Sequence, residues 1–169
     1  HGRNQFVAAA GQFYLAYGLA ARDIHASITT GNAPSIDVIA SSSDGSKAIS
    51  FQVKTTPNAY RRNRYGSEGY EWTVGLGVVG KQSEPYWYAL VDLQASQEGF
   101  APRIFFAPSF WVAQFVKPSF GRGMFFLPRK AEDISLERWD IVKSYLNVEL
   151  EPVRWATTWP EEKLVRWGE

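Results

Sequence analysis

Three residues whose side chains could perform chemistry together are Asp37, Gln52 and Lys54. Residues 48–54 alternate between apolar and polar types, which is typical of a strand with one buried face. Because alternate residues of a strand share a face, Gln52 and Lys54 are expected to point the same way. A carboxylate, an amide oxygen and an ammonium that met on that face would suit metal-assisted hydrolysis of a phosphodiester.

The spacing between Asp37 and Gln52 predicts that they meet. Residues 36–40 form a second predicted strand, and Asp44-Gly45 between the two strands is a strong hairpin signal. If these two residues occupy the centre of the turn, paired residues have numbers that add to 89, as 37 and 52 do. We therefore expect Asp37 directly opposite Gln52, at a Cβ separation of about 4.5–5.5 Å. A slip of one residue would turn every side chain to the other face.

This geometry predicts a role for each residue. Asp37 would bridge a divalent cation, and the side-chain carbonyl of Gln52 and the main-chain carbonyl of Val53 would complete its protein ligands. Lys54 would orient or deprotonate the attacking water and stabilise charge on the phosphate. Because the chain has no cysteine, oxygen ligands are the expected kind, and they favour Mg²⁺ or Mn²⁺.

The same residues resemble the site of the PD-(D/E)XK nuclease superfamily, which includes restriction endonucleases and Holliday-junction resolvases. Asp37 matches the first acid of that site, and Gln52-Val53-Lys54 matches its acid-x-Lys strand with glutamine in place of the acid. Some members of the superfamily use Gln-x-Lys there. The resemblance covers about residues 4–107 and implies a restriction-endonuclease-like α/β fold, with a mixed central sheet flanked by helices, that acts on DNA.

A fourth site residue follows from the resemblance. The superfamily often has a glutamate after a glycine on its first helix, and Gly11-Gln12 matches that place with a second amide. Two interpretations of Gln12 are open: it supports the site, or it is an ordinary polar residue on the helix surface.

The elements that must position these residues follow from periodicity. Apolar residues at three- and four-residue steps predict a helix over residues 4–22. A strand is expected at 24–29, and a helix at 136–146 with Ser135 as its N-cap. The remaining predictions are strands and one short helix, at residues 72–76, 86–93, 103–107 and, for the helix, 109–116.

Residues 57–70 are polar and locally basic, which predicts a long mobile loop. Three arginines and a tyrosine within it could clamp a phosphate backbone and stack on bases: Tyr60, Arg61, Arg62 and Arg64. The alternative is that this short charged run is simply a solvated loop.

Composition sets the limits on these interpretations. A chain of 169 residues with 45% apolar content is expected to form one domain, with a nuclease-like core at about 4–107 and an aromatic-rich C-terminal extension at 108–169. A net charge of +1 means that any nucleic-acid surface must be local. No apolar run is long enough to cross a bilayer, so a cytoplasmic protein without a membrane partner is the expectation.

Three functions are open at this point. The first is a divalent-metal-dependent endonuclease acting on DNA, for which a homodimer would be natural, since two strands need two sites. The second is a DNA-binding module that has kept the fold and lost cleavage, with Gln12 and Gln52 as the marks of that loss. The third is a structural or oligomerisation domain whose aromatic C-terminal tail mediates assembly.

Overall fold

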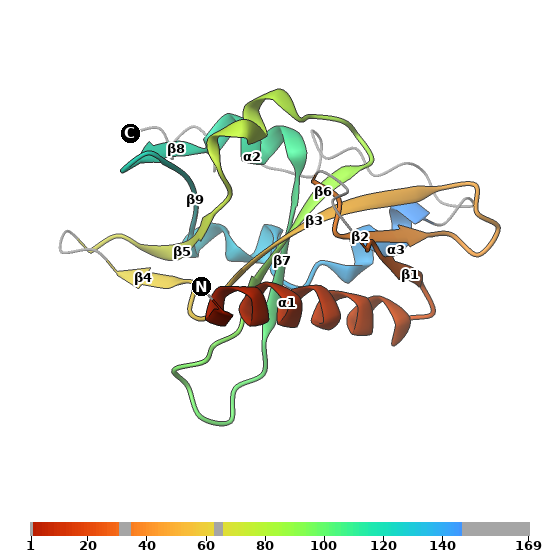
Figure 1. The fold of residues 1–169 in the computed structure, drawn as a ribbon, viewed down its shortest axis with the longest axis horizontal. Coiled ribbons are helices and arrows are strands. Elements are labelled where there is room, and N and C mark those ends of the chain that lie inside the picture. Colours follow the sequence, from red (N-terminus) through yellow and green to blue (C-terminus); the bar gives the residue numbers. More distant parts are fainter. Residues whose placement is uncertain (1, 31–34, 63–65, 147–169) are drawn as a thin grey trace.

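The fold is a mixed α/β arrangement of two sheets and a few helices (Figure 1). The computed structural model describes residues 2–30, 35–62 and 66–146. Its helical elements are α1 (Gly2–Ala20), η1 (Leu76–Gly80), α2 (Ser109–Phe115), η2 (Arg129–Ile134) and α3 (Trp139–Leu146). Its strands are β1 (His25–Ile28), β2 (Val38–Ser41), β3 (Ala48–Thr56), β4 (Tyr60–Arg62), β5 (Glu68–Thr73), β6 (Tyr86–Asp92), β7 (Arg103–Pro108), β8 (Lys117–Ser119) and β9 (Arg122–Pro128).

The first sheet has five strands in the order β1-β2-β3-β6-β7. Only the β3–β6 pair is parallel; the other three pairs are antiparallel, so the sheet is mixed, as expected. A parallel pair requires a crossover, which is usually a single helix. Here the crossover consists of β4, β5 and η1. The chain therefore builds part of a second sheet before it returns to the first.

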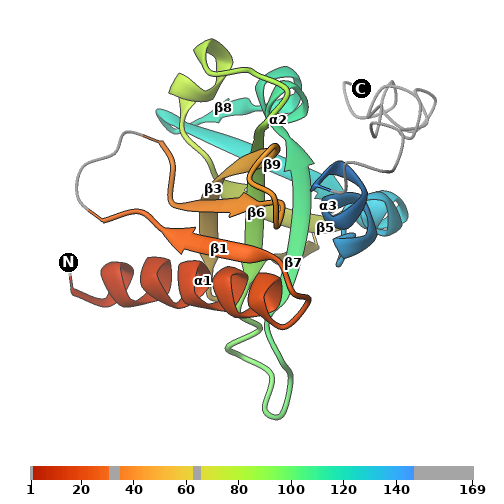
Figure 2. The ribbon, with the colours of Figure 1, turned by 90° about the vertical axis from the view of Figure 1, so that its right-hand side faces the viewer.

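The second sheet has four strands in the order β4-β5-β9-β8. It packs on one face of the first sheet, where the Phe105 ring of β7 lies 4.8 Å from the Tyr70 ring and 5.0 Å from the Trp72 ring of β5. The opposite face is covered by helices (Figure 2): α1 lies across β1 to β3, and Trp139 of α3 packs on Phe106. Helices therefore flank the mixed sheet on one face, and the second sheet covers the other face.

The predicted hairpin register is confirmed. Val38 pairs with Phe51, Ile39 with Ser50, Ala40 with Ile49 and Ser41 with Ala48, so that every pair adds to 89. Gly45 has a φ of +72° at the turn centre. The amide of Ser46 and the hydroxyls of Ser42 and Ser46 donate hydrogen bonds to Asp44 and hold the pKa of its carboxyl at about 2.

The prediction of a long loop at residues 57–70 is wrong, because much of this segment forms an antiparallel ladder. Tyr60, Arg61 and Arg62 pair with Tyr70, Gly69 and Glu68. The strand expected at 72–76 is β5, which begins four residues earlier. Strand β9, which was not predicted from the sequence, pairs with β5, and these two strands form the interior of the second sheet.

The predicted start of the last helix is also wrong. Helix α3 begins at Trp139, and residues 135–137 instead run beside β7. The Ser135 hydroxyl donates to the Phe106 carbonyl at 2.7 Å, and the Glu137 carboxylate accepts the Ile104 amide at 2.8 Å. The main-chain carbonyl of Ser135 and the main-chain amide of Glu137 form hydrogen bonds with β7. In a longer helix these groups would have formed hydrogen bonds within the helix instead.

Candidate functional site

The centre of the candidate site is the half-buried carboxylate of Asp37, which accepts three hydrogen bonds. The side-chain amide of Gln12 donates to Oδ1 at 3.1 Å, and that of Gln52 donates to Oδ2 at 2.9 Å. The main-chain amide of Val53 donates to Oδ2 at 2.7 Å. The three donors come from α1 and β3, so the carboxylate joins the first helix to the sheet.

Asp37 reaches this position because it lies just outside the β2–β3 ladder, whose first residue on β2 is Val38. Val38 is the ladder partner of Phe51, and the Asp37 amide also donates to the Phe51 carbonyl, at 2.8 Å. Asp37 therefore does not sit in a regular pair with Gln52, although the two side chains meet as expected. Strand β2 has no residue that pairs with Val53. The main-chain amide of Val53 donates instead to the Asp37 carboxylate.

The main chain of Val53 thus faces the Asp37 side of the strand. In an antiparallel ladder the amide and the carbonyl of one residue point to the same side. Since the Val53 amide donates to Asp37, the Val53 carbonyl is directed to the same region. The alternation of β3 is as predicted: Phe51 and Val53 are buried, while Gln52 and Lys54 are half-buried on the other face.

Gln12 is brought to the site by a close contact between α1 and β3. A Cβ atom on Gly11 would lie 1.9 Å from the Thr55 hydroxyl oxygen, so only glycine permits this separation. The next residue of the helix, Gln12, then reaches the Asp37 carboxylate. Of the two interpretations of Gln12, the structure places it at the site.

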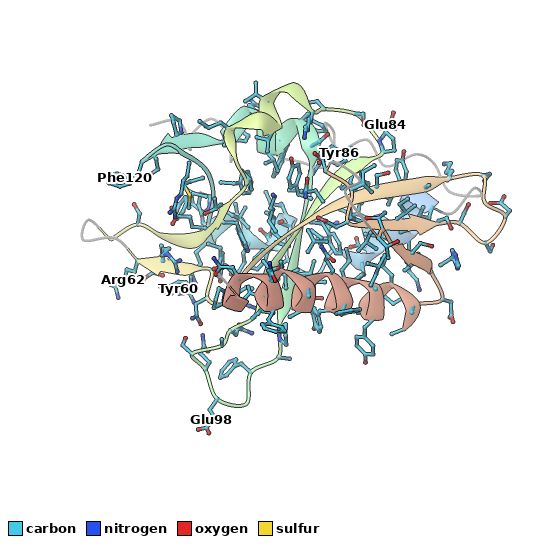
Figure 3. All side chains as sticks on the ribbon, in the orientation of Figure 1. Tyr60, Arg62, Glu84, Tyr86, Glu98 and Phe120 are labelled. Carbon is cyan, nitrogen blue, oxygen red and sulfur yellow. The ribbon has the colours of Figure 1, made fainter. Side chains whose placement is uncertain are left out.

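Tyr86 is a site residue that the sequence did not reveal. It is buried at the start of β6, and its hydroxyl lies 3.1 Å from Oε1 of Gln52 and 2.9 Å from the Ser35 carbonyl. Because Tyr86 holds Oε1, the amide of Gln52 directs its NH₂ group toward Asp37. Figure 3 shows Tyr86 in the upper part of the molecule. The sequence predicted its strand but not the parallel pairing of β6 with β3 that brings it here.

Lys54 lies next to this cluster on the same face of β3. Burial lowers the pKa of its ammonium group, the nearby Asp37 carboxylate opposes that shift, and Lys81 adds to it. Among the described residues, no hydrogen bond or ion pair engages the Lys54 ammonium. Lys81, at the end of η1, donates a hydrogen bond to the Ser35 hydroxyl. Lys54 therefore lies near the Asp37 carboxylate, and Lys81 brings a second positive charge to the neighbourhood of Lys54.

The donor types of the site fit a hard divalent cation. Such a cation prefers carboxylate, amide and carbonyl oxygens, and Asp37, Gln12, Gln52 and Val53 supply these. The side-chain amides of Gln12 and Gln52 direct their NH₂ groups to Asp37. Rotation of either amide by a half-turn would place its carbonyl oxygen where the NH₂ group now lies. The described residues contain no group of three or more His, Cys, Asp or Glu side chains able to hold a metal. Asp37 supplies the one negative charge among these four groups, so we expect the site to bind a divalent cation weakly.

The predicted DNA-contact residues lie apart from Tyr86 on the outer part of β4. Figure 3 shows Tyr60 and Arg62 at the left of the view, below and to the left of Tyr86. Both arginines are exposed, with Arg61 Nε 3.7 Å from Glu71 and Arg62 Nε 3.5 Å from Glu68. Arg64 lies outside the described residues. The structure does not bring these side chains into the Asp37 cluster.

No helix within the described residues combines the length and the apolar character needed to span a membrane. No protein-family model, curated protein or solved structure matches the chain.

Proposed function

We propose that the protein is a divalent-metal-dependent nuclease with a restriction-endonuclease-like core, and that it hydrolyses phosphodiester bonds of DNA. The observation that carries the proposal is the convergence of Asp37, Gln52 and Lys54 at the end of the β2–β3 hairpin. The mixed order of the five-stranded sheet is compatible with it. A carboxylate beside a half-buried lysine and two amides is a combination that phosphodiester hydrolysis can use.

The residues of the chain would divide the chemistry as follows. Asp37, Gln52, Gln12 and the Val53 carbonyl would hold Mg²⁺ or Mn²⁺, which when bound stabilises negative charge on the phosphate. Lys54 would contact a phosphate oxygen or orient the attacking water, and its lowered pKa makes transfer of its proton easier. Tyr86 would hold Gln52 in both orientations: its hydroxyl now lies against Oε1, and after the half-turn it can accept a hydrogen bond from the NH₂ group of the amide.

Cleavage of supercoiled plasmid and of single-stranded DNA in Mg²⁺ or Mn²⁺ tests this proposal. Wild-type protein should nick DNA, and Asp37→Ala and Lys54→Ala should each lower the rate by about 100-fold or more, a typical loss for a group that stabilises transition-state charge. Gln52→Glu should lower the Mn²⁺ concentration that gives half the maximal rate, because it adds a second negative charge.

Glu98→Ala and Lys130→Ala are the matched controls. Both residues are exposed, and Glu98 lies at the tip of the loop that projects below α1 (Figure 3). Neither substitution should change the rate. Cleavage that survives Asp37→Ala and Lys54→Ala would show that the activity belongs to another site or to a contaminant.

A second function, DNA binding without cleavage, is favoured by one observation. The two oxygens of Asp37 already accept three N–H hydrogen bonds, and the amides of Gln12 and Gln52 have to release two of them before their oxygens can face a metal ion. In a protein that binds DNA without cleaving it, these three hydrogen bonds can stay formed. Two lysines at the site and two exposed arginines on β4 would then supply the contacts to phosphate.

Fluorescence anisotropy with a labelled duplex in EDTA separates the two functions. If the protein only binds, affinity should fall with salt, and Arg61→Ala with Arg62→Ala should reduce the slope of log K against log salt by about one per arginine. Lys130→Ala serves as the control for loss of one exposed charge. A wild-type protein that neither cleaves nor binds DNA would contradict both functions.

A further inference from the structure

The outward face of α1 carries a stripe of exposed aromatic residues. Phe6, Phe13 and Tyr17 leave 76%, 66% and 68% of their surface exposed. Their spacings of seven and four residues place them on one side of the helix, and Ala10 and Ala20 fall on the same stripe and are exposed. Large apolar side chains grouped in this way on a surface mark an interaction site.

The chemistry of α1 limits what could cover this stripe. Arg3 is the one charged residue of α1, and the stretch that carries the stripe, residues 4–21, contains no Asp, Glu, Lys or Arg, although 21% of the chain is charged. Helices that lie on a membrane carry basic residues on their polar face, and nucleic-acid surfaces require cations. An uncharged aromatic face therefore fits another apolar protein surface, and two copies of it meet without bringing like charges together.

The area of the stripe is close to what a dimer requires. A fully buried aromatic side chain covers about 150–250 Å², so the exposed parts of these three amount to roughly 400 Å² per copy. Two copies would bury about 800 Å² from the aromatics alone, and the neighbouring alanines bring the total to about 1,000 Å². That is near the lower limit for a specific interface.

We propose that α1 of one copy packs against α1 of a second copy in an antiparallel helix pair centred near Phe13. In this pairing Phe6 lies beside Ala20 of the other copy and Tyr17 beside its Ala10, so that these two large side chains meet small ones, and the two Phe13 rings meet at the centre. The same surface patch serves both copies, as a twofold interface requires. The proposal does not depend on whether the protein cleaves DNA.

Sedimentation equilibrium of the full chain tests the pairing. Wild-type protein should be dimeric at tens of micromolar. Phe13→Glu and Tyr17→Glu should each raise the dimer dissociation constant by ~100-fold or more, because each substitution places two charges in the apolar interface. Phe120→Glu is the matched control: its aromatic ring is fully exposed in the β8–β9 turn, and the dimer should persist.

Cross-linking gives a second measurement that does not require the dimer to dissociate. The chain has no cysteine, so Phe13→Cys introduces a single thiol, which a short bismaleimide should link to that of a second copy. Phe100→Cys, at another exposed aromatic position, should not be linked. A monomeric wild type, a dimer that survives both glutamate substitutions, or equal linking at positions 13 and 100 would overturn the proposal.

Discussion

At the scale of single residues, Asp37 is a structural group as well as a candidate ligand. Its carboxylate connects α1 to β3 and satisfies the main-chain amide of Val53 beyond the end of the β2 ladder. Hydrogen bonds to a charged acceptor contribute about 1.5–3 kcal/mol each, and donors left without a partner add a cost. The stability of the hairpin end should therefore depend on this one side chain.

Asp37→Ala should lower the free energy of unfolding by about 2–3 kcal/mol: it removes the acceptor of three hydrogen bonds, but because the site is half-buried, water can replace the carboxylate and offset part of the loss. Urea denaturation at pH 7 measures the change. Glu98→Ala, which replaces an exposed carboxylate on a distant loop, should leave the midpoint unchanged. A wild-type midpoint for Asp37→Ala would mean that these hydrogen bonds contribute nothing to stability.

Lys54 has the opposite effect, since burial of its ammonium lowers its pKa and therefore costs stability in the charged form. Lys54→Met should raise the free energy of unfolding at pH 7 by the order of 1 kcal/mol, a common gain when a site residue is replaced by an apolar one.

The pH dependence of that gain follows from the sign of the shift. Between the lowered pKa and the ordinary value of 10.5, unfolded wild-type protein binds more protons than folded protein does, so wild-type stability rises with pH. The advantage of Lys54→Met over wild type should therefore shrink as pH approaches 10.5. Thermal melts from pH 7 to 10 test this, with Lys130→Met as the exposed control; an advantage that grows with pH would contradict it.

At the scale of elements, the distance between α1 and β3 decides whether Gln12 reaches the site. Gly11 lies against Thr55, whose hydroxyl oxygen is buried and has no hydrogen-bond partner within the described structure. An alanine at position 11 would gain about 1 kcal/mol of helix propensity, but overpacking costs about 1–3 kcal/mol. The clash with Thr55 should decide the outcome.

Gly11→Ala should therefore destabilise the protein by about 1–2 kcal/mol, and Thr55→Ala alone should change stability by less than about 1 kcal/mol. In the double variant most of the cost of Gly11→Ala should disappear, because the hydroxyl that meets the new Cβ is gone. A double-mutant cycle measured by urea denaturation gives the coupling. Strict additivity of the two changes would contradict this account of the α1–β3 contact.

At the scale of the whole molecule, the two sheets share their packing. Phe105 of the first sheet contacts Tyr70 and Trp72 of the second, and the indole N–H of Trp72 donates to the Val91 carbonyl at 3.1 Å. Tyr70, Trp72 and Phe105 are all buried. The sheets are therefore expected to unfold together.

Phe105→Ala should lower the free energy of unfolding by about 3–5 kcal/mol, because it removes a buried ring between the sheets. Unfolding followed by far-UV circular dichroism and by tryptophan fluorescence should give coincident transitions in the wild type. Phe100→Ala, at a ring that is 61% exposed, should change stability by no more than about 0.5 kcal/mol. Two separate transitions in the wild type would show that the sheets fold independently.

The hairpin that carries the candidate site was determined by sequence alone, since its information is local. Asp44-Gly45 fixed the turn and thereby the register of β2 with β3, and the alternation of β3 placed Gln52 and Lys54 on one face. Strands β6 and β7 were equally visible from their apolar residues. Each of these features depends on neighbours within one or two strands of the chain.

Only the tertiary structure decided what surrounds that hairpin. Tyr86 reaches Gln52 through a parallel pairing, and Gln12 reaches Asp37 because Gly11 allows α1 to approach Thr55. The exposed stripe of α1 is likewise visible only once its opposite face is packed on the sheet. These contacts join residues that are distant in the chain, so they cannot be predicted from local periodicity. The turn and the alternation of β3 depend on adjacent residues and can be.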